Sequence, residues 1–157
     1  MPKTSFLSRR LRPVRTLLGL LLRRPLLGTS VVPLLSDGRI VLILRRDDGL
    51  WGLPGGLVDW GEDIHTSAKR ELLEETGLTL TRIDQLVGVY SQSDRDPRFH
   101  SVCVTLAAQV EGIFQIGDPD EVLEVKAFRP DELPYGQLTH DHARQLKDFF
   151  AGKTILD

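Results

Sequence analysis

Three glutamates crowd one short segment of the chain, at Glu71, Glu74 and Glu75. On an α-helix, which turns by about 100° per residue, they fall at about 0°, −60° and +40° and so share one face. Like charges at these spacings repel by roughly a few tenths of a kcal/mol per pair, and Arg70 can offset one of them through Glu74. Oxygen ligands gathered in this way suit Mg²⁺ or Mn²⁺ better than zinc, for which histidine or cysteine would be expected. The simpler alternative is an exposed acidic helix face.

These glutamates belong to a longer pattern that consists of Gly56, Glu62 and the run from Arg70 to Leu78, RELLEETGL. The spacing matches Gly-x5-Glu-x7-Arg-Glu-U-x-Glu-Glu-x-Gly-U, the signature of the Nudix hydrolases, in which U is a bulky aliphatic residue. Seven fixed positions, each matched at random about once in 15 to 20, give a chance match of about one in ten million. The chain therefore resembles the Nudix family over about residues 30–150.

The resemblance implies an α/β fold, an α/β/α sandwich around a mixed β-sheet, with the signature forming a loop–helix–loop. It also implies hydrolysis of a nucleoside diphosphate linked to another group, with Mg²⁺ or Mn²⁺ as cofactor. The ion would relieve the repulsion among the carboxylates, neutralise the pyrophosphate and lower the pKa of a bound water for in-line attack on phosphorus. Carried over by position, Glu62 and Arg70 hold the helix and its acids in place, and the metal ligands are Glu71, Glu74, Glu75 and the carbonyl of Gly55.

The group that accepts the proton of the attacking water has two candidates. In the family the base is either a signature glutamate or a glutamate on a later loop. Glu71 is the first candidate here, and Glu121, in the acidic turn GDPDE before a predicted strand, is the second. A base must reach the attacking water within hydrogen-bond distance. An ordinary solvated turn is the alternative interpretation of residues 117–121.

A second stretch bears on the substrate: GVYS at residues 88–91, then DRDPR at 94–98 and His100. Arginine forks and a histidine on a loop after a strand can bind phosphate or ribose oxygens. The stretch is similar to the ADP-ribose pyrophosphatase branch, which implies ADP-ribose as substrate, split into AMP and ribose 5-phosphate. The predicted substrate contacts are Arg45, Arg95, Arg98 and His100. In the alternative, the loop is a charged surface whose arginines pair with Asp94 and Asp96.

Other functions are compatible with the same signature. An oxidised-dNTP or dinucleoside polyphosphate pyrophosphohydrolase is the first alternative within the family. A non-catalytic Nudix module that only binds a nucleotide is the alternative from another class, and the intact set of Glu71, Glu74 and Glu75 argues against it.

Several elements must position these residues. Asp37-Gly38 separates two β-branched runs and predicts a tight hairpin in which both turn residues have positive φ. Glycine and proline make residues 51–56 a loop whose backbone can approach a ligand closely. Strands mixed with helices indicate a sheet covered on both faces. The predicted strands are 30–36, 39–46, 85–91, 101–111 and 122–128, and the predicted helices are 63–76, ended by Gly77, and 139–150, with Thr139 as N-cap.

Three further residues carry weaker signals. His140 and His142 flank Asp141 near the start of the last predicted helix, where the helix dipole disfavours a charged imidazole. A role for them as ligands is therefore the less favoured interpretation. Cys103 is expected to be a small core residue within a strand.

The chain divides into a basic arm, residues 1–29, and a Nudix domain, residues 30–157. Residues 1–30 contain seven basic side chains and no acid, or +7, while the other 13 basic and all 22 acidic residues sum to −9. Helical spacing of apolar residues predicts a helix over 13–22. It could pack on the domain or on a second subunit, or lie on an anionic membrane surface through residues 5–27. Nucleic-acid binding is disfavoured because Phe6 is the arm's only aromatic residue.

Length and composition limit the remaining possibilities. The chain has 157 residues, 41% hydrophobic and 27% charged, with a net charge of −2. This is typical of one folded domain and excludes a disordered, collagen-like or multi-span membrane protein. A single cysteine excludes an internal disulfide, and a reduced, cytoplasmic setting is expected. By analogy with the ADP-ribose branch, a homodimer is also expected.

Overall fold

A computed structural model describes residues 24–157 of the chain. The predicted helix over 13–22 lies outside the described residues, and so does most of the segment considered for membrane contact. None of the helices among residues 24–157 is long and apolar enough to cross a membrane.

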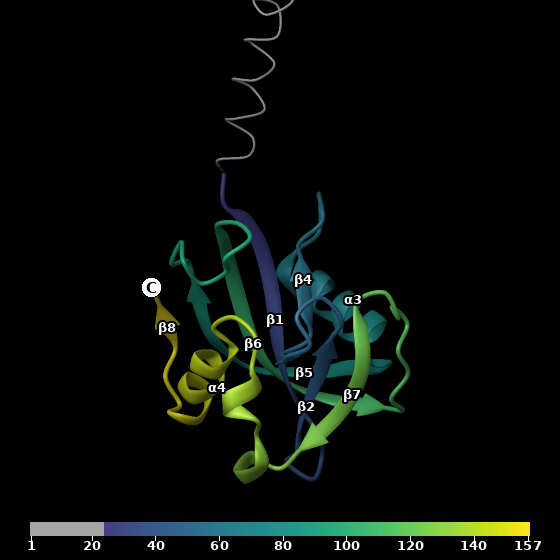
Figure 1. The fold of residues 1–157 in the computed structure, drawn as a ribbon. Helices are drawn as coiled ribbons and strands as arrows, with labels where there is room; N and C mark the ends of the chain where they lie inside the picture. Colours follow the sequence, from purple (N-terminus) through teal and green to yellow (C-terminus); the bar gives the residue numbers. More distant parts are fainter. Residues whose placement is uncertain (1–23) are drawn as a thin grey trace, which may run out of the picture.

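The described residues form one mixed sheet with the strand order β3-β2-β1-β6-β5-β8, to which β4 adds beside β1 and β7 beside β2 (Figure 1). The β1–β6 and β5–β8 pairs are parallel and the others are antiparallel. The strands are β1 (Leu26–Leu34), β2 (Ile40–Arg45), β3 (Trp51–Gly52), β4 (Gly55–Leu57), β5 (Leu78–Tyr90), β6 (Ser101–Gly112), β7 (Val122–Phe128) and β8 (Ile155–Leu156).

Helices cover the two faces of this sheet, α3 (Ile64–Thr76) on one and α4 (His142–Phe150) on the other (Figure 1). Successive side chains of a strand point to opposite faces. Accordingly, Val31 packs with Leu72 of α3, whereas its neighbour Val32 packs with Leu146 of α4. Short 3₁₀ helices at Pro130–Glu132 and Tyr135–Gln137 lead into α4. The expected α/β/α sandwich is thus confirmed.

Helix α3, which carries the signature glutamates, has the expected limits. Asp63 is its N-cap and accepts a hydrogen bond from the backbone N–H of Thr66 at 2.7 Å. Gly77 ends the helix with φ 76°, and its N–H donates to the Leu73 carbonyl at 2.9 Å. A side chain here would collide with the backbone of Gln115, because a Cβ on Gly77 would lie 2.7 Å from that nitrogen. The helix is therefore capped at both ends, which fixes the position of the face that carries its glutamates.

The hairpin between β1 and β2 differs from the prediction. Gly38 has φ 83°, whereas Asp37 has no positive φ. The N–H of Leu35 donates to the carbonyl of Arg39, and the N–H of Gly38 to that of Leu35, each at 2.9 Å. This is a type I turn followed by a glycine bulge, which needs one left-handed residue instead of two.

Three other boundaries were also wrong. Helix α4 starts at His142 with Asp141 at the N-cap position, because the hydroxyl of Thr139 donates to Asp48 instead. Strand β5 begins at Leu78, well before the predicted start at Gln85, and its register shifts interrupt the alternation that would have revealed it. Strand β1 begins at Leu26, so residues 26–29, assigned to the arm from the sequence, belong to the sheet.

Candidate active site

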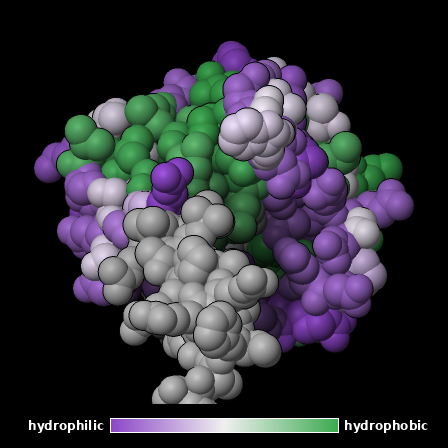
Figure 2. Space-filling view, turned by 90° about the horizontal axis from the view of Figure 1, so that it is seen from above, coloured by the Kyte–Doolittle hydropathy of each residue, from purple (hydrophilic) through white to green (hydrophobic). Residues whose placement is uncertain are grey.

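A cavity of about 570 Å³ opens where α3, β4, the end of β2 and the start of α4 meet, and we call it the main cleft. Seen from above, hydrophilic side chains cover one side of this end of the molecule and hydrophobic ones gather on the other (Figure 2). Two residues that the sequence analysis selected, Glu62 and His100, are absent from the cleft lining. Those that line it are Arg45, Gly55, Arg70, Glu71, Glu74, Glu75, Arg95, Arg98 and Glu121.

Glu75 is the most deeply placed carboxylate of the cleft, with 3% of its surface exposed. Its Oε2 accepts a hydrogen bond from the backbone N–H of Gly55 at 2.8 Å, which ties α3 to β4. Burial raises the pKa of Glu75 to about 8; the Gly55 N–H opposes this, and the charges of Glu71 and Glu121 add to it. A nearby cation strongly stabilises the charged form of a carboxylate that is buried in this way.

Glu71 lies against the backbone of β4, one helical turn before Glu75. A Cβ on Gly56 would come 2.5 Å from its Oε1, so only glycine leaves room for this carboxylate. Burial raises the pKa of Glu71, and the neighbouring guanidinium of Arg70 opposes the rise. The glycine of the signature is thus required by close packing against the acid.

Arg70 joins the acids of this region through one guanidinium group. Its Nε and Nη2 donate to the two oxygens of Glu62 at 2.8 and 2.9 Å. Its Nη1 donates to Glu71 Oε1 at 2.7 Å and to Glu74 Oε2 at 3.3 Å. Hydrogen bonding from Arg70 lowers the pKa of Glu62 to about 2. Glu62, which does not line the cleft, is therefore the partner that orients Arg70, and Arg70 in turn positions Glu71.

The donor set around the cleft can be compared with the needs of a divalent cation. Among residues 24–157, no group of three or more His, Cys, Asp or Glu side chains is arranged, as it stands, to hold a metal ion. Instead the Nη1 of Arg70 bridges Glu71 and Glu74. Glu74 is 52% exposed, so turning it away from this surface ion pair costs little. The candidate ligands are all oxygen atoms, and two of them belong to Glu71 and Glu75, whose pKa values burial raises. These residues therefore fit Mg²⁺ or Mn²⁺.

The arginines of the predicted substrate loop are already paired with aspartates. Arg95 forms a two-pronged ion pair with Asp141 at 2.8 and 3.0 Å, and only 8% of its side chain is exposed. Arg98 pairs in the same way with Asp96 at 2.9 and 3.0 Å, as the surface-loop alternative supposed, yet it remains 46% exposed on the cleft. Arg98 can therefore also contact a ligand, whereas Arg95 is a fixed part of the wall.

The two remaining substrate candidates differ in position. Arg45 binds both oxygens of Asp47, at 2.7 and 3.0 Å, and lines the main cleft. His100 points away from it, and its Nε2 forms a hydrogen bond with the Ser91 carbonyl at 2.9 Å. The structure thus brings Arg45 and Arg98 to the cleft and leaves His100 outside.

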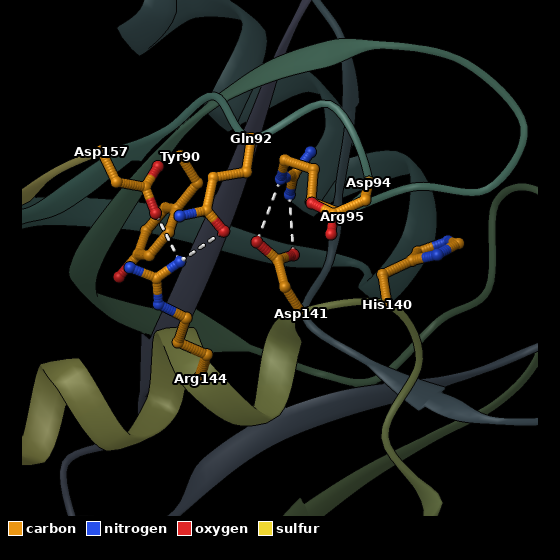
Figure 3. A pocket seen from close by; sticks show the side chains of 8 residues that line it. All are labelled: Tyr90, Gln92, Asp94, Arg95, His140, Asp141, Arg144 and Asp157. Carbon is orange, nitrogen blue, oxygen red and sulfur yellow. Dashed lines mark hydrogen bonds and ion pairs between the residues drawn. The ribbon is translucent and has the colours of Figure 1, made fainter.

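A smaller cavity of about 230 Å³ is lined in part by the Arg95–Asp141 pair (Figure 3). Arg144 closes part of it through an ion pair with Asp157 and a hydrogen bond to Gln92 at 3.4 Å. Arg95 and His140 line both cavities. His140 has φ 47°, the one positive value at a non-glycine residue among residues 24–157, and such strain is often found at functional sites.

The sequence did not indicate that residues next to the start of α4 would line the cleft. His142, Leu53, Ser30 and Cys103 meet there from four separate segments. The only signal in the sequence was the triplet His140-Asp141-His142 at the start of a predicted helix.

Curated relatives match much of the chain. An ADP-ribose pyrophosphatase of Methanocaldococcus jannaschii is 37% identical over 75% of this chain and 69% of its own. An oxidized purine nucleoside triphosphate hydrolase of Mus musculus is 30% identical over 71% of this chain and 72% of its own. Among solved structures, the NUDIX domain of Shewanella oneidensis NrtR, complexed with ADP ribose, is 25% identical with a TM-score of 0.70, covering 82% of this chain and 88% of its own.

Fold and site together define a pyrophosphohydrolase: an α/β/α sandwich whose loop–helix–loop presents carboxylates to a cleft rimmed by arginines. The family model of the NUDIX domain matches residues 24–149. The chain belongs to the Nudix hydrolase family, as its signature indicated.

We predict that Gly56→Ala impairs catalysis while preserving the fold. The added methyl group would displace the Glu71 carboxylate, and a misplacement of about 1 Å can lower kcat by about 10²-fold. Gly136→Ala is the matched control, since a Cβ there meets nothing within 4 Å. Turnover of a pyrophosphate substrate and circular dichroism would be measured for both. Wild-type kcat in Gly56→Ala would remove Glu71 from the catalytic machinery.

Proposed function

We propose that the protein hydrolyses the pyrophosphate bond of ADP-ribose, to AMP and ribose 5-phosphate, with Mg²⁺ or Mn²⁺ as cofactor. The observation that carries the proposal is the pair of neighbouring carboxylates, Glu71 and Glu75, whose pKa values burial raises, on the same cleft as Arg45 and Arg98. Buried acids of this kind are costly without a cation, and a pyrophosphate brings the negative charge that cation and arginines would bind.

The roles of the residues follow from their contacts. Glu71, Glu74, Glu75 and the Gly55 carbonyl would hold the ion, which when bound supplies charge neutralisation and a water of lowered pKa. Arg70, fixed by Glu62, keeps Glu71 in place. Arg45 and Arg98 contact phosphate or ribose oxygens with the N–H groups that their aspartate partners leave free. In the reaction, the water oxygen bonds to phosphorus while the bond from phosphorus to the bridging oxygen breaks.

Glu121 is the better placed of the two candidates for the general base. Glu71 is less available as a base, because its Oε1 accepts a hydrogen bond from Arg70 at 2.7 Å and its carboxylate is also a proposed ligand of the metal ion. Glu121 lies at the exposed end of the same cleft, near enough for its charge to raise the pKa of Glu71 and Glu75. Among residues 24–157, no ion pair engages its carboxylate. It would take the proton of the attacking water directly.

The choice of ADP-ribose rests on the relatives and on the substrate loop. The Methanocaldococcus jannaschii relative is named for this substrate, and the Shewanella oneidensis domain has ADP ribose bound. The Mus musculus relative, named for oxidised purine nucleoside triphosphates, supports the alternative substrate class. Both kinds of molecule, ADP-ribose and a purine nucleoside triphosphate, join a purine nucleoside to a phosphoanhydride, which is the chemistry that this cleft can recognise.

Removing the charge of Glu75 tests the metal site. Glu75→Gln keeps an oxygen for the Gly55 N–H but weakens cation binding, so we expect kcat to fall by about 10³-fold, or roughly 4 kcal/mol. Glu132→Gln, on an exposed 3₁₀ helix, is the control and should behave as wild type. Calorimetry with Mn²⁺ would show weaker uptake in the first variant alone. EDTA should abolish activity, and added Mg²⁺ should restore it; full activity in EDTA would contradict metal dependence.

Glu121→Gln tests the base. The loss of a general base lowers kcat by about 10²- to 10⁴-fold, and Mn²⁺ affinity should remain close to that of wild type because Glu121 is not a proposed ligand. Glu124→Gln, on the exposed side of β7, is the matched control. A kcat within about twofold of wild type in Glu121→Gln would transfer the role to Glu71.

A substrate panel tests the proposed preference. ADP-ribose should have a higher kcat/KM than oxidised dGTP, diadenosine polyphosphates, NADH and nucleotide sugars in the presence of Mg²⁺. Phosphate-containing products can be separated by ion-exchange chromatography. A higher kcat/KM for oxidised dGTP would select the alternative, and binding of all compounds without turnover would select the non-catalytic module.

A further inference from the structure

The sheet face that α3 covers continues beyond the part that the helix protects. Val31 of β1 packs in the core beneath α3, and Leu27 lies four residues earlier on the same face, because successive side chains of a strand alternate. Leu27 is nevertheless 44% exposed. It lies at the end of the sheet where β1 begins and where the chain enters the domain (Figure 1). Within residues 24–157, this end of the face is therefore only partly covered.

Leu27 and its two neighbours across the sheet, Val58 and Val102, form a short apolar surface that we call the open strip. Leu27 pairs with Val102 in the parallel β1–β6 ladder. The Val58 N–H donates to the Leu27 carbonyl at 2.9 Å, which continues the register between β1 and β4. Both valines are partly exposed. Seen from above, hydrophobic side chains gather on one side of this end of the molecule (Figure 2). Adjoining exposed apolar side chains are typical of a contact surface.

Acidic side chains border the open strip. The loop between β4 and α3 contains Asp59, Glu62 and Asp63 and no basic residue. Glu62 is paired with Arg70, but Asp59 is 72% exposed and Asp63 is exposed as well. Trp60, between them, is fully exposed and offers its ring to a cation. The border therefore favours an occupant that joins apolar with basic side chains, and it disfavours an anionic membrane surface.

The basic arm of the same chain joins these two properties. Residues 1–30 contain seven basic side chains and no acid. At about 100° per residue, one set of apolar residues falls within about 80° of a helical projection, and Thr16 falls on the opposite side. The set consists of Leu7, Leu11, Val14, Leu18 and Leu21. Its sequence pattern thus supplies an apolar face with arginines beside it.

The arm can reach the open strip of its own chain. Six residues separate Leu21 from Leu27, and an extended segment of that length spans about 20 Å. The three neighbouring chain segments of the strip are only about 10 Å across. A short tether also raises the effective concentration of the arm at the strip to about the millimolar range. Docking within one chain is therefore favoured over docking on a second copy.

We propose that residues 7–21 dock on the open strip of the same chain. Their apolar face would cover Leu27, Val58 and Val102, and their basic side chains would lie near Asp59 and the ring of Trp60. Asp59 also lines the main cleft, so the docked arm would lie beside the mouth of that cleft. The assignment does not depend on which nucleotide the protein hydrolyses.

Labelling of an introduced thiol by iodoacetamide tests the docking in the whole chain. The natural Cys103 is buried, and burial raises the pKa of its thiol, so it should react slowly. We expect the thiol of Leu27→Cys to react about 10-fold more slowly than that of Leu27→Cys/Leu18→Asp, which corresponds to an arm docked about nine-tenths of the time. The charge introduced by Leu18→Asp would be buried against the strip and so prevents docking. Thr16→Asp adds the same charge on the opposite side and should leave the labelling slow.

A second position supplies the matched control. Leu123 of β7 is 43% exposed, about as much as Leu27. Leu123→Cys should be labelled at the same rate with and without Leu18→Asp. An equal acceleration at both positions would indicate a general loss of stability and would overturn the docking. Circular dichroism should show the same folded domain in all variants.

Three further results would overturn the proposal, each in a different way. Equal labelling of Leu27→Cys with and without Leu18→Asp would show that the arm leaves the strip uncovered. Protection that disappears on dilution, together with a dimer mass in light scattering, would assign the strip to a second copy. Protection that appears only with vesicles of phosphatidylcholine and phosphatidylglycerol would assign it to a membrane. Slow labelling of a monomer without vesicles, released by Leu18→Asp and not by Thr16→Asp, is the expected result.

Discussion

The arrangement of this enzyme depends on two carboxylates that are held next to each other with little water around them. Burial raises the pKa of both Glu71 and Glu75, and the charge of Glu71 adds to the rise at Glu75. The fold offsets this with the Arg70 guanidinium on one acid and the Gly55 N–H on the other. The glycines of strand β4 let its backbone approach these two carboxylates closely, since a Cβ at Gly56 would occupy the place of the Glu71 carboxylate.

The sandwich architecture divides the main cleft between two kinds of chemistry. Helix α3 brings acids to one side of β4, while the first residues of α4 bring His142 to the opposite face of the sheet. The side with the acids is therefore suited to a cation, whereas the other side carries a neutral imidazole near Arg45 and Arg95. The arginines between them are oriented by aspartates, as with Arg98 on Asp96, so their positions are set before a ligand arrives. Such preorganisation reduces the entropy lost on binding.

Much of the fold could be predicted from local patterns. The C-terminal limit of α3 followed from a terminal glycine, whose effect acts within one helical turn. Strand β7 agreed with its prediction because a continuous run of suitable residues forms it. The first half of β5 was not predicted because its bulges break the two-residue period of a strand. Thr139 was wrongly predicted as the N-cap of the last helix because its hydroxyl bonds to Asp48, far away in the chain. Local signals fail where a distant partner competes for the same group.

By itself the sequence determined the family, the reaction class and the face that the signature glutamates share, because these depend on residue types at short, fixed spacings along one helix. Only the tertiary structure decided which arginines reach the cleft, that Arg95 is a wall while His100 points away, and that His142 is neutral with one nitrogen open. Those properties arise where segments far apart in the chain meet, because burial and hydrogen-bond partners are properties of the packed molecule. Spacing along the chain carries no information on them.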